Sequence, residues 1–251
     1  MAQPKCYTST DVSAGLKSSG ISGHEILLVH SSLKSFGQIA GGASSVAGAL
    51  IAMGNTVIFP AFTGKITDGK NCPPVMNVTL SPTWTGAIPE TARKMPGTLR
   101  SLHPTHSLVG FGARAAEMLA GHERTHSPCD ESSPFYKLVK NNAVIALFGC
   151  DHNSNTLVHC CEELARVPYH LQADVTDGVV VSESQTIVVA NQLHNWQKPP
   201  TDFNAIEHLL LAARAITFAE VCQAPVKIID ARKMYDVLYN QLICEPEFLL
   251  V

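Results

Sequence analysis

The segment 151–162, DHNSNTLVHCCE, holds the densest group of side chains that could carry out acid–base chemistry. It follows the apolar run 143–148 almost directly. A helix capped near Asn155 would place His159 and Glu162 on one face, three residues apart. A carboxylate beside an imidazole fixes the tautomer of the ring and stabilises its protonated form, which is what a general base needs. The alternative is a buried structural histidine beside a solvated glutamate, and the residues alone leave both open.

A second group follows the apolar run 26–29, at a turn that reads HSSLKSFG over residues 30–37. Backbone N–H groups, three serine hydroxyls and one lysine could together hold a phosphate-bearing ligand. The spacing of a Walker loop, G-x-x-x-x-G-K-[ST], is absent. The turn is therefore a candidate phosphate site, with an ordinary serine-rich turn as the alternative.

The residues that could bind a metal ion are poorly spaced for it. His103 and His106 stand three apart, but Pro104 between them favours extended structure, in which such a pair points to opposite faces. The eight cysteines form no C-x-x-C pair, and the adjacent Cys160 and Cys161 suit neither a zinc site nor an ordinary disulfide. The sequence therefore predicts no bound metal, and reduced cysteines that are mostly small buried residues.

The elements that must position these groups alternate between strand and helix. Short apolar runs predict strands over 26–29, 56–62, 106–110, 143–148 and 226–229. Periodic or capped segments predict helices over 44–53 (capped by serines), 88–95, 113–121, 133–140, 155–166 and 205–215. A strand, a helix and a strand within about 40 residues indicate a parallel crossover. The alternation around 179–189 predicts an antiparallel hairpin. We therefore expect a layered α/β fold with a β-rich C-terminal appendage, and ligands at the carboxyl ends of its strands.

Composition excludes several classes of protein. Of the 251 residues, 45% are apolar and 16% are charged, which excludes intrinsic disorder. A net charge of −3 argues against non-specific nucleic-acid binding. Residues 1–20 are polar and lack the apolar core of a secretory signal, and the longest apolar stretch, 208–216, is too short for a membrane span. We expect a cytoplasmic protein with neither nucleic-acid nor membrane partners, as a monomer or homodimer.

Six blocks, taken in order, resemble the aminoglycoside 3-N-acetyltransferase family: VHSSLKSFG, GGASSVAGAL, TVIFPAF, RSLHPTHS, ESSPFYKL and LFGCDHNSNTLVHCCEELARVPY. They lie within residues 26–170. The resemblance implies an acetyl-CoA-dependent acyltransferase with the family's α/β/α sandwich in one domain, residues 1–251. Residues 1–20 would be a polar lead and 171–251 a less well matched, acceptor-side region.

The resemblance also assigns roles to single residues. It implies that the turn binds coenzyme A through His30, Ser31, Ser32, Leu33, Lys34, Ser35 and Gly37. Ser107 would lie near the thioester and His103 would line the cofactor channel. His159 would be the general base and Glu162 the acid beside it. The two cysteines between them stand where small or aliphatic residues are expected, which raises the chance of thiol-dependent inactivation.

The implied activity is direct acetyl transfer in a ternary complex, without a metal, from acetyl-CoA to a cationic amine, the 3-amino group of an aminoglycoside. A cationic acceptor predicts an acidic cleft, for which the candidate residues are Asp68, Glu162, Glu163, Asp174, Asp177 and Asp202. One alternative keeps this chemistry and changes the amine, and another is a coenzyme A binder without catalysis. A third, of another class, is a metal-assisted hydrolase built on His103, His106, Asp151, His152 and His159.

Overall fold

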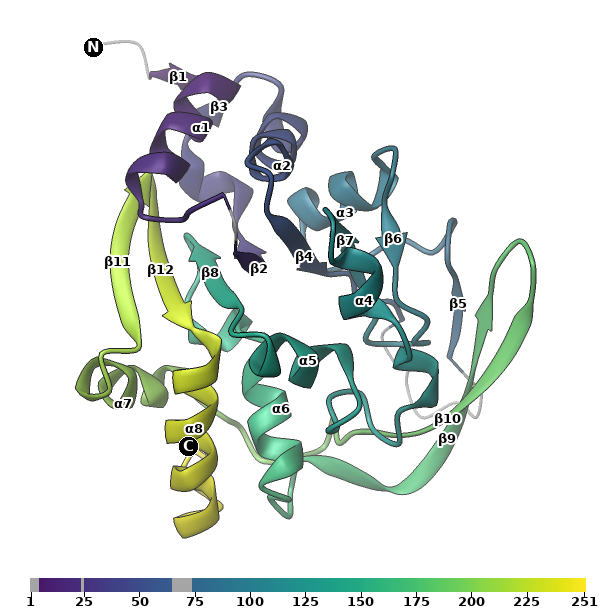
Figure 1. The fold of residues 1–251 in the computed structure, drawn as a ribbon. Helices are drawn as coiled ribbons and strands as arrows, with labels where there is room; N and C mark the ends of the chain where they lie inside the picture. The colour runs from purple at the N-terminus through teal and green to yellow at the C-terminus, as the bar shows by residue number, and fades with distance from the viewer. Residues whose placement is uncertain (1–4, 24, 65–73) are drawn as a thin grey trace.

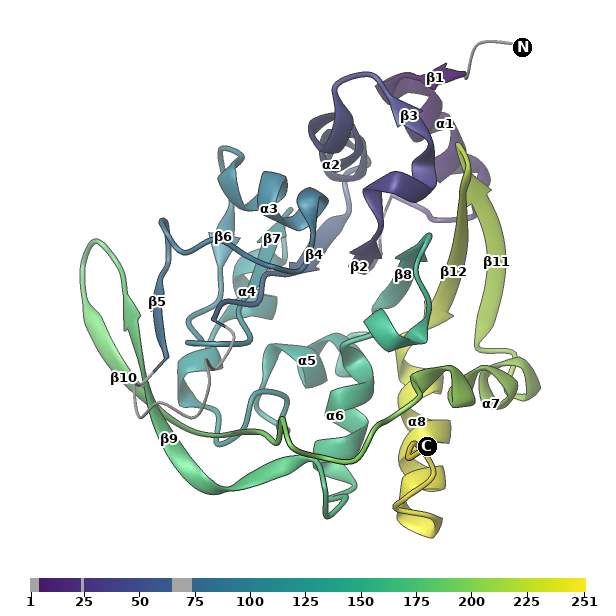
Figure 2. The ribbon, with the colours of Figure 1, turned by 180° about the vertical axis from the view of Figure 1, so that it is seen from behind.

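The computed structural model describes residues 5–23, 25–64 and 74–251. Within them, seven strands form a central mixed sheet, seen from two sides in Figure 1 and Figure 2. These strands are β2 (Ile26–Ser31), β4 (Thr56–Pro60), β6 (Leu99–Arg100), β7 (Leu108–Phe111), β8 (Val144–Phe148), β11 (Ile216–Val221) and β12 (Ala224–Asp230). Their order across the sheet is β11-β12-β8-β2-β4-β7-β6. β2 is parallel to both β4 and β8, which confirms the predicted crossover, while β7 and β12 flank these strands in the antiparallel direction.

Both faces of the sheet are buried, as the continuous apolar runs predict. Along β2, Ile26 and Leu28 join one core cluster, and Leu27 and Val29 join the other. The helices whose side chains complete the second cluster are α1 (Ser9–Ser18), α2 (Gly42–Ala52) and α3 (Ala87–Lys94). Those that complete the first are α4 (Ala115–Leu119), α5 (Pro134–Lys140), α6 (Leu157–Leu164), α7 (Glu207–Ala212) and α8 (Ala231–Cys244). The predicted layered α/β/α arrangement is confirmed.

The predicted hairpin is present and longer than expected. β9 (Leu171–Val181) and β10 (Thr186–His194) pair antiparallel, and β5 (Val75–Asn77) adds a parallel edge to β9. Figure 1 shows this hairpin, in green, reaching away from the central sheet. The appendage is nevertheless smaller than the C-terminal third, because β11 and β12 extend the main sheet.

The segment 1–20, predicted to be a polar lead, packs against the core through a helix where the structure describes it. Thr8 and Asp11 form a capping box that starts α1, and Val12 and Leu16 are completely buried. Two apolar residues four apart are enough to dock a helix, yet they barely alter the composition of the segment. A second pairing, β1 (Cys6–Tyr7) with β3 (Gln38–Ile39), also ties this region down.

Two local predictions need smaller corrections. α2 is not capped by a serine, because Gly41, with φ 78°, occupies the N-cap and Ser45 Oγ donates to Ala40 O instead (2.6 Å). The helix predicted over 205–215 is split into a 3₁₀ turn, η4 (Phe203–Ile206), followed by α7. Among the described residues, none of the helices combines the length and the apolar character that crossing a bilayer requires.

A close backbone approach joins the turn after β2 to the end of β8. Gly149 has φ +62°, and its carbonyl oxygen accepts a hydrogen bond from Ser35 Oγ (2.9 Å). A Cβ atom on Gly149 would lie 2.0 Å from Ser35 Cβ, well inside van der Waals contact. Only glycine fits here, so this contact sets the spacing between the two loops that follow the strands.

We predict that Gly149→Ala destabilises the protein more than Gly97→Ala does. Gly97 also has positive φ (+81°) but has open space around its Cα, so its substitution should cost only the left-handed strain of about 1–2 kcal/mol. Gly149→Ala adds a steric overlap with Ser35 worth about 1–3 kcal/mol more. Urea unfolding of both variants measures the difference, and equal losses would contradict the packing described here.

Candidate active site

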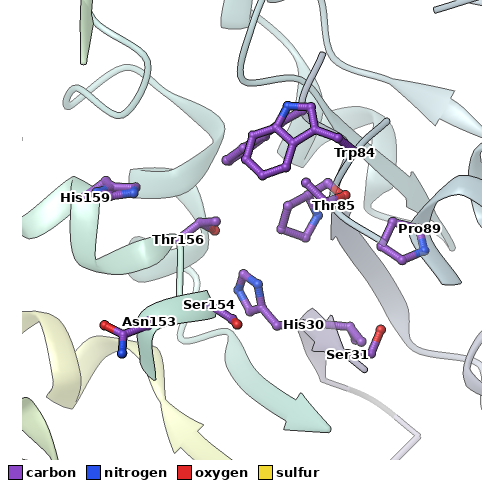
Figure 3. Close-up of a pocket in the computed structure, with 12 residues that line it drawn as sticks. His30, Ser31, Trp84, Thr85, Pro89, Asn153, Ser154, Thr156 and His159 are labelled. Atoms are coloured by element: carbon purple, nitrogen blue, oxygen red, sulfur yellow. The ribbon is translucent and has the colours of Figure 1, made fainter. Parts of the chain in front are cut away.

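A cleft of about 250 Å³ opens where β2, β4 and β8 end, the edge at which a parallel sheet is expected to bind ligands. Figure 3 shows the side chains around it. The residues that line it are Val29, His30, Ser31, Pro60, Phe62, Trp84, Thr85, Pro89, Asn153, Ser154, Thr156 and His159. Four stretches of chain therefore meet at this edge: the end of β2, the end of β4, residues 84–89 before and within α3, and residues 153–159 after β8.

His159 and Glu162 pair as their spacing predicts. His159 Nδ1 lies 2.8 Å from Glu162 Oε2, and the His159 side chain is 21% exposed at the cleft (Figure 3). An ionised carboxylate can only accept, so Nδ1 must carry the proton and the lone pair is left on Nε2. Asn155, just before α6, supports the start of the helix as expected. Its Oδ1 accepts a hydrogen bond from the N–H of Leu157, in the first turn (3.3 Å).

Glu162 is completely buried and is held in its ionised form. Its Oε2 also lies 3.1 Å from His170 Nδ1, and its Oε1 lies 3.4 Å from Lys198 Nζ. Burial by itself raises the pKa of Glu162, but the interactions with His159 and His170 outweigh burial and hold that pKa well below its ordinary value. The carboxylate can therefore stabilise a positive charge on His159 throughout the neutral range.

The neighbouring Glu163 is also buried, in a different environment. It accepts hydrogen bonds from Ser127 Oγ and from the N–H of Cys129 (3.0 Å), and it lies 2.7 Å from His194 Nε2. Burial raises the pKa of Glu163 to about 8, against the opposing effect of these hydrogen bonds. The two adjacent glutamates therefore differ in charge at neutral pH.

Six histidine rings form a continuous series that leads from the cleft into the core. Successive ring centroids are 4.2–5.8 Å apart through His159, His170, His194, His106, His103 and His122. Sequence reasoning missed His122, His170 and His194 as members of the site. No local spacing identifies them, because they come from distant parts of the chain and meet only in the folded protein.

The turn predicted to bind coenzyme A reaches the cleft through its first two residues. His30 and Ser31 line the cleft, and within the described residues neither His30 Nε2 nor Ser31 Oγ has a hydrogen-bond partner. The rest of the turn, including the 3₁₀ segment η1 (Leu33–Phe36), lies outside the lining: Ser32, Leu33, Lys34, Ser35 and Gly37. Lys34 is exposed, while the Ser35 hydroxyl donates its hydrogen bond to the carbonyl oxygen of Gly149.

His103, expected to line the cofactor channel, and Ser107, expected near the thioester, are not among the residues that line the cleft. Both are completely buried behind it. Ser107 Oγ donates to Ala61 O (2.6 Å) and accepts from Arg100 Nε (3.1 Å), so it supports the chain after β4. His103 Nδ1 accepts from the N–H of His106 (3.0 Å) and closes the turn around Pro104.

Most of the predicted acidic residues also lie elsewhere. Glu162 and Glu163 are buried beneath the cleft, while Asp174, Asp177 and Asp202 are exposed and outside its lining. Asp68 lies outside the described residues. Of the described residues that line the cleft, none carries a carboxylate.

Two further expectations are overturned. Of the five residues considered for a metal-assisted hydrolase, only His159 belongs to a group of potential ligands within 4.8 Å of one another, in the part of the chain that is described. His152 instead lies 3.3 Å from Glu207. Cys160 and Cys161 are completely buried, and burial raises the pKa of both thiols, so neither offers the reactive thiolate that thiol-dependent inactivation requires.

The residues of the cleft that sequence reasoning left out fall into two kinds. Asn153, Ser154 and Thr156 stand in the polar segment after β8, where the position alone could have indicated them. Trp84 and Thr85 follow a long connection, and no local signal brings them to the cleft.

The sequence model of a family described as "Aminoglycoside 3-N-acetyltransferase" matches residues 28–242. The SPbeta prophage-derived aminoglycoside N(3')-acetyltransferase-like protein YokD of Bacillus subtilis (strain 168) is 32% identical over 183 residues, 64% of this chain and 66% of that protein. Aminoglycoside N(3)-acetyltransferase VII of Streptomyces paromomycinus is 28% identical over 198 residues, 69% of this chain and 66% of that protein. The chain thus spans about two thirds of the length of these curated relatives.

The fold is shared with solved structures. AAC-IIIb, in a binary complex with CoASH, superposes with a TM-score of 0.83 and covers 95% of this chain and 97% of its own, at 24% identity. At that identity the similarity establishes the fold.

The buried histidines predict an unusually early loss of stability in acid. Burial lowers the pKa of His30 and of His122 to about 3, and that of His103 well below its ordinary 6.5. Between pH 6.5 and about 3, the unfolded chain binds protons on these rings while the folded protein does not. The stability that the neutral rings contribute is therefore complete above pH 6.5 and is lost as the pH falls toward 3. Each histidine contributes a slope of about 1.4 kcal/mol per pH unit, or about 4 for the three together.

The free energy of unfolding in urea at pH 7.5, 6.5, 5.5 and 4.5 measures this slope. His30→Gln should reduce it by about 1.4 kcal/mol per pH unit, and the exposed His208→Gln is the matched control. A stability that stays constant down to pH 5 would contradict burial of neutral imidazoles.

Proposed function

This chain belongs to the aminoglycoside 3-N-acetyltransferase family, and from that premise we propose that it transfers acetyl from acetyl-CoA to an amine of an aminoglycoside. The observation that carries the proposal is the pair of His159 and Glu162, with its base exposed in a cleft at the carboxyl edge of the sheet. The names of the curated relatives and the coenzyme complex of AAC-IIIb support the same substrates.

His159 acts as the general base. A protonated amine is not a nucleophile, so the acceptor attacks the thioester carbonyl carbon as the free amine and loses a proton as the C–N bond forms. The lone pair on His159 Nε2 takes that proton, and the resulting imidazolium lies 2.8 Å from the ionised Glu162. The C–S bond then breaks, and the departing coenzyme A thiolate takes the proton from the imidazolium. The carboxylate favours the charged ring and keeps it in the orientation the transfer needs.

The same cleft carries polar atoms that can meet the thioester. His30 Nε2, Ser31 Oγ and Thr156 Oγ1 are buried without partners among the described residues. A donor aimed at the developing oxyanion is typically worth about 3–4 kcal/mol. We assign oxyanion stabilisation to this group in place of Ser107, because Ser107 lies behind the cleft.

The turn at 30–37 is the proposed coenzyme A contact. His30 and Ser31 face the cleft, where the thioester end must lie, and the exposed Lys34 offers a cation to the phosphates. For the acceptor, Trp84 and Phe62 supply aromatic faces on which a cationic amine can rest. Which amine is accepted is decided by assay across a panel that includes aminoglycosides and other polyamines.

Acetyl-CoA should raise the melting temperature of the protein. A ligand that binds only the native state stabilises it by RT ln(1 + [L]/Kd), about 2.7 kcal/mol at a hundred times Kd. Thermal unfolding with and without millimolar acetyl-CoA tests this. The absence of any shift removes the coenzyme assignment, and a shift without consumption of acetyl-CoA by any amine favours a binder without catalysis.

His159→Ala should lower kcat by about 10²–10⁴-fold, the usual effect of removing a general base. Glu162→Gln should lose less activity, because it weakens orientation and charge while the base remains. The exposed His208→Ala is the matched control. If a folded His159→Ala protein turned over at nearly the wild-type rate, His159 would not be the base and His30 would be the next candidate.

A further inference from the structure

We propose that His159, His170 and His194 form a binding site for one divalent transition-metal ion, Zn²⁺ above all, and that this ion inhibits the enzyme. The inhibitory part rests on the proposed function of His159 as the base. The ion is no cofactor in this scheme, so acetyl transfer does not require it.

The three imidazoles each present one ring nitrogen, and these nitrogens all lie within 4.8 Å of one another. They come from α6, from the residue before β9 and from the end of β10. A tetrahedral zinc site with bonds of about 2.0–2.1 Å separates its ligand atoms by about 3.4 Å. Binding would therefore draw the three nitrogens closer together and would leave the fourth position to water from the cleft.

His170 supplies an independent reason to expect a ligand. Its side chain is 1% exposed, and neither ring nitrogen has a hydrogen-bond partner among the described residues. Its Nδ1 lies 3.1 Å from Glu162 Oε2 without hydrogen-bond geometry. Leaving a buried polar atom unsatisfied costs about 1–3 kcal/mol. A metal ion bound by this ring would supply the missing interaction.

Two glutamates support the other two rings. Glu162 engages Nδ1 of His159 at 2.8 Å, and Glu163 engages Nε2 of His194 at 2.7 Å. A metal bound by the other nitrogen of each ring would leave these glutamates where a carboxylate or carbonyl usually stands beside a metal-binding histidine. Lys198 Nζ lies 3.4 Å from Glu162 Oε1. Its positive charge offsets part of the attraction between Glu162 and a bound metal cation.

An ion can reach the site from the cleft. His159 is partly exposed there, whereas His170 and His194 lie buried behind it. A coordinated imidazole has no free lone pair for the proton of an amine, and coordination through Nδ1 would displace Glu162. Either mode disables the base, so the ion and catalysis exclude each other.

A second group of potential ligands, Cys129, Glu163 and His194, does not carry the same argument. Glu163 is already satisfied by Ser127, by the backbone of Cys129 and by His194. All three residues are buried, with no member on the cleft.

The test uses chelator-treated protein and Co²⁺, whose four-coordinate nitrogen complexes absorb strongly in the visible. One equivalent of Co²⁺ should produce this band in the wild type, and one equivalent of Zn²⁺ should abolish it. The band should be lost in His170→Gln and in His194→Gln and retained in the exposed control His208→Gln. Should one buried variant fail to fold, His159→Gln removes the exposed ligand and tests the same band.

No band in the wild type, or an undiminished band in the folded ligand variants, would overturn the site. Because binding is measured without acetyl-CoA, its outcome is independent of the proposed function. Once the wild type has been shown to transfer acetyl, equimolar Zn²⁺ should stop that transfer, and EDTA should restore it. Zinc that binds with one-to-one stoichiometry yet leaves turnover unchanged would overturn the inhibitory role.

Discussion

The ionised carboxylate of Glu162, buried inside the protein, is the constraint around which the site is built. An uncompensated buried charge costs several kcal/mol, so the fold must surround it with partners. One partner, His159, comes from the same helix, while His170 and Lys198 come from either end of the β9–β10 hairpin. Glu163, the next residue, contacts His194 at the end of β10. The base of the hairpin therefore closes over two adjacent glutamates of α6, and the orientation of the proposed base depends on that tertiary contact.

Glu162 contacts both His159 and Lys198. One carboxylate oxygen faces His159 Nδ1, and the other lies 3.4 Å from Lys198 Nζ. The buried rings behind His159 remain uncharged, because burial lowers the pKa of His106 and His194 well below the ordinary value. A positive charge formed on His159 during transfer would thus face one carboxylate and a set of neutral rings. The cost is a core rich in imidazoles, which water would solvate better than the protein interior does.

Features that depend on residues close together in the sequence could be predicted, whereas features that depend on contacts between distant segments could not. The pairing of His159 with Glu162 depends on helical spacing, and the crossover from β2 to β4 on local patterning, and both are present. The positions of His103 and Ser107 depend on how the chain between β6 and β7 packs, and neither reaches the cleft. His170 and His194 join the site through the hairpin, whose ends are separated by more than twenty residues. Local rules describe elements, whereas the walls of the cleft are set by contacts between them.

The adjacent cysteines show how packing fixes the helix that carries the proposed base. Val158, Cys160 and Cys161 are all completely buried in the core cluster shared with α8, while His159 between them is the residue of that stretch that reaches the cleft. A helix of eight residues with so much of its surface buried cannot rotate without opening voids or overlaps on several sides. Thiols are small enough to pack closely there, and their raised pKa keeps them uncharged. Larger side chains at 160 or 161 would overlap with this close packing, on the helix that also carries His159 and Glu162.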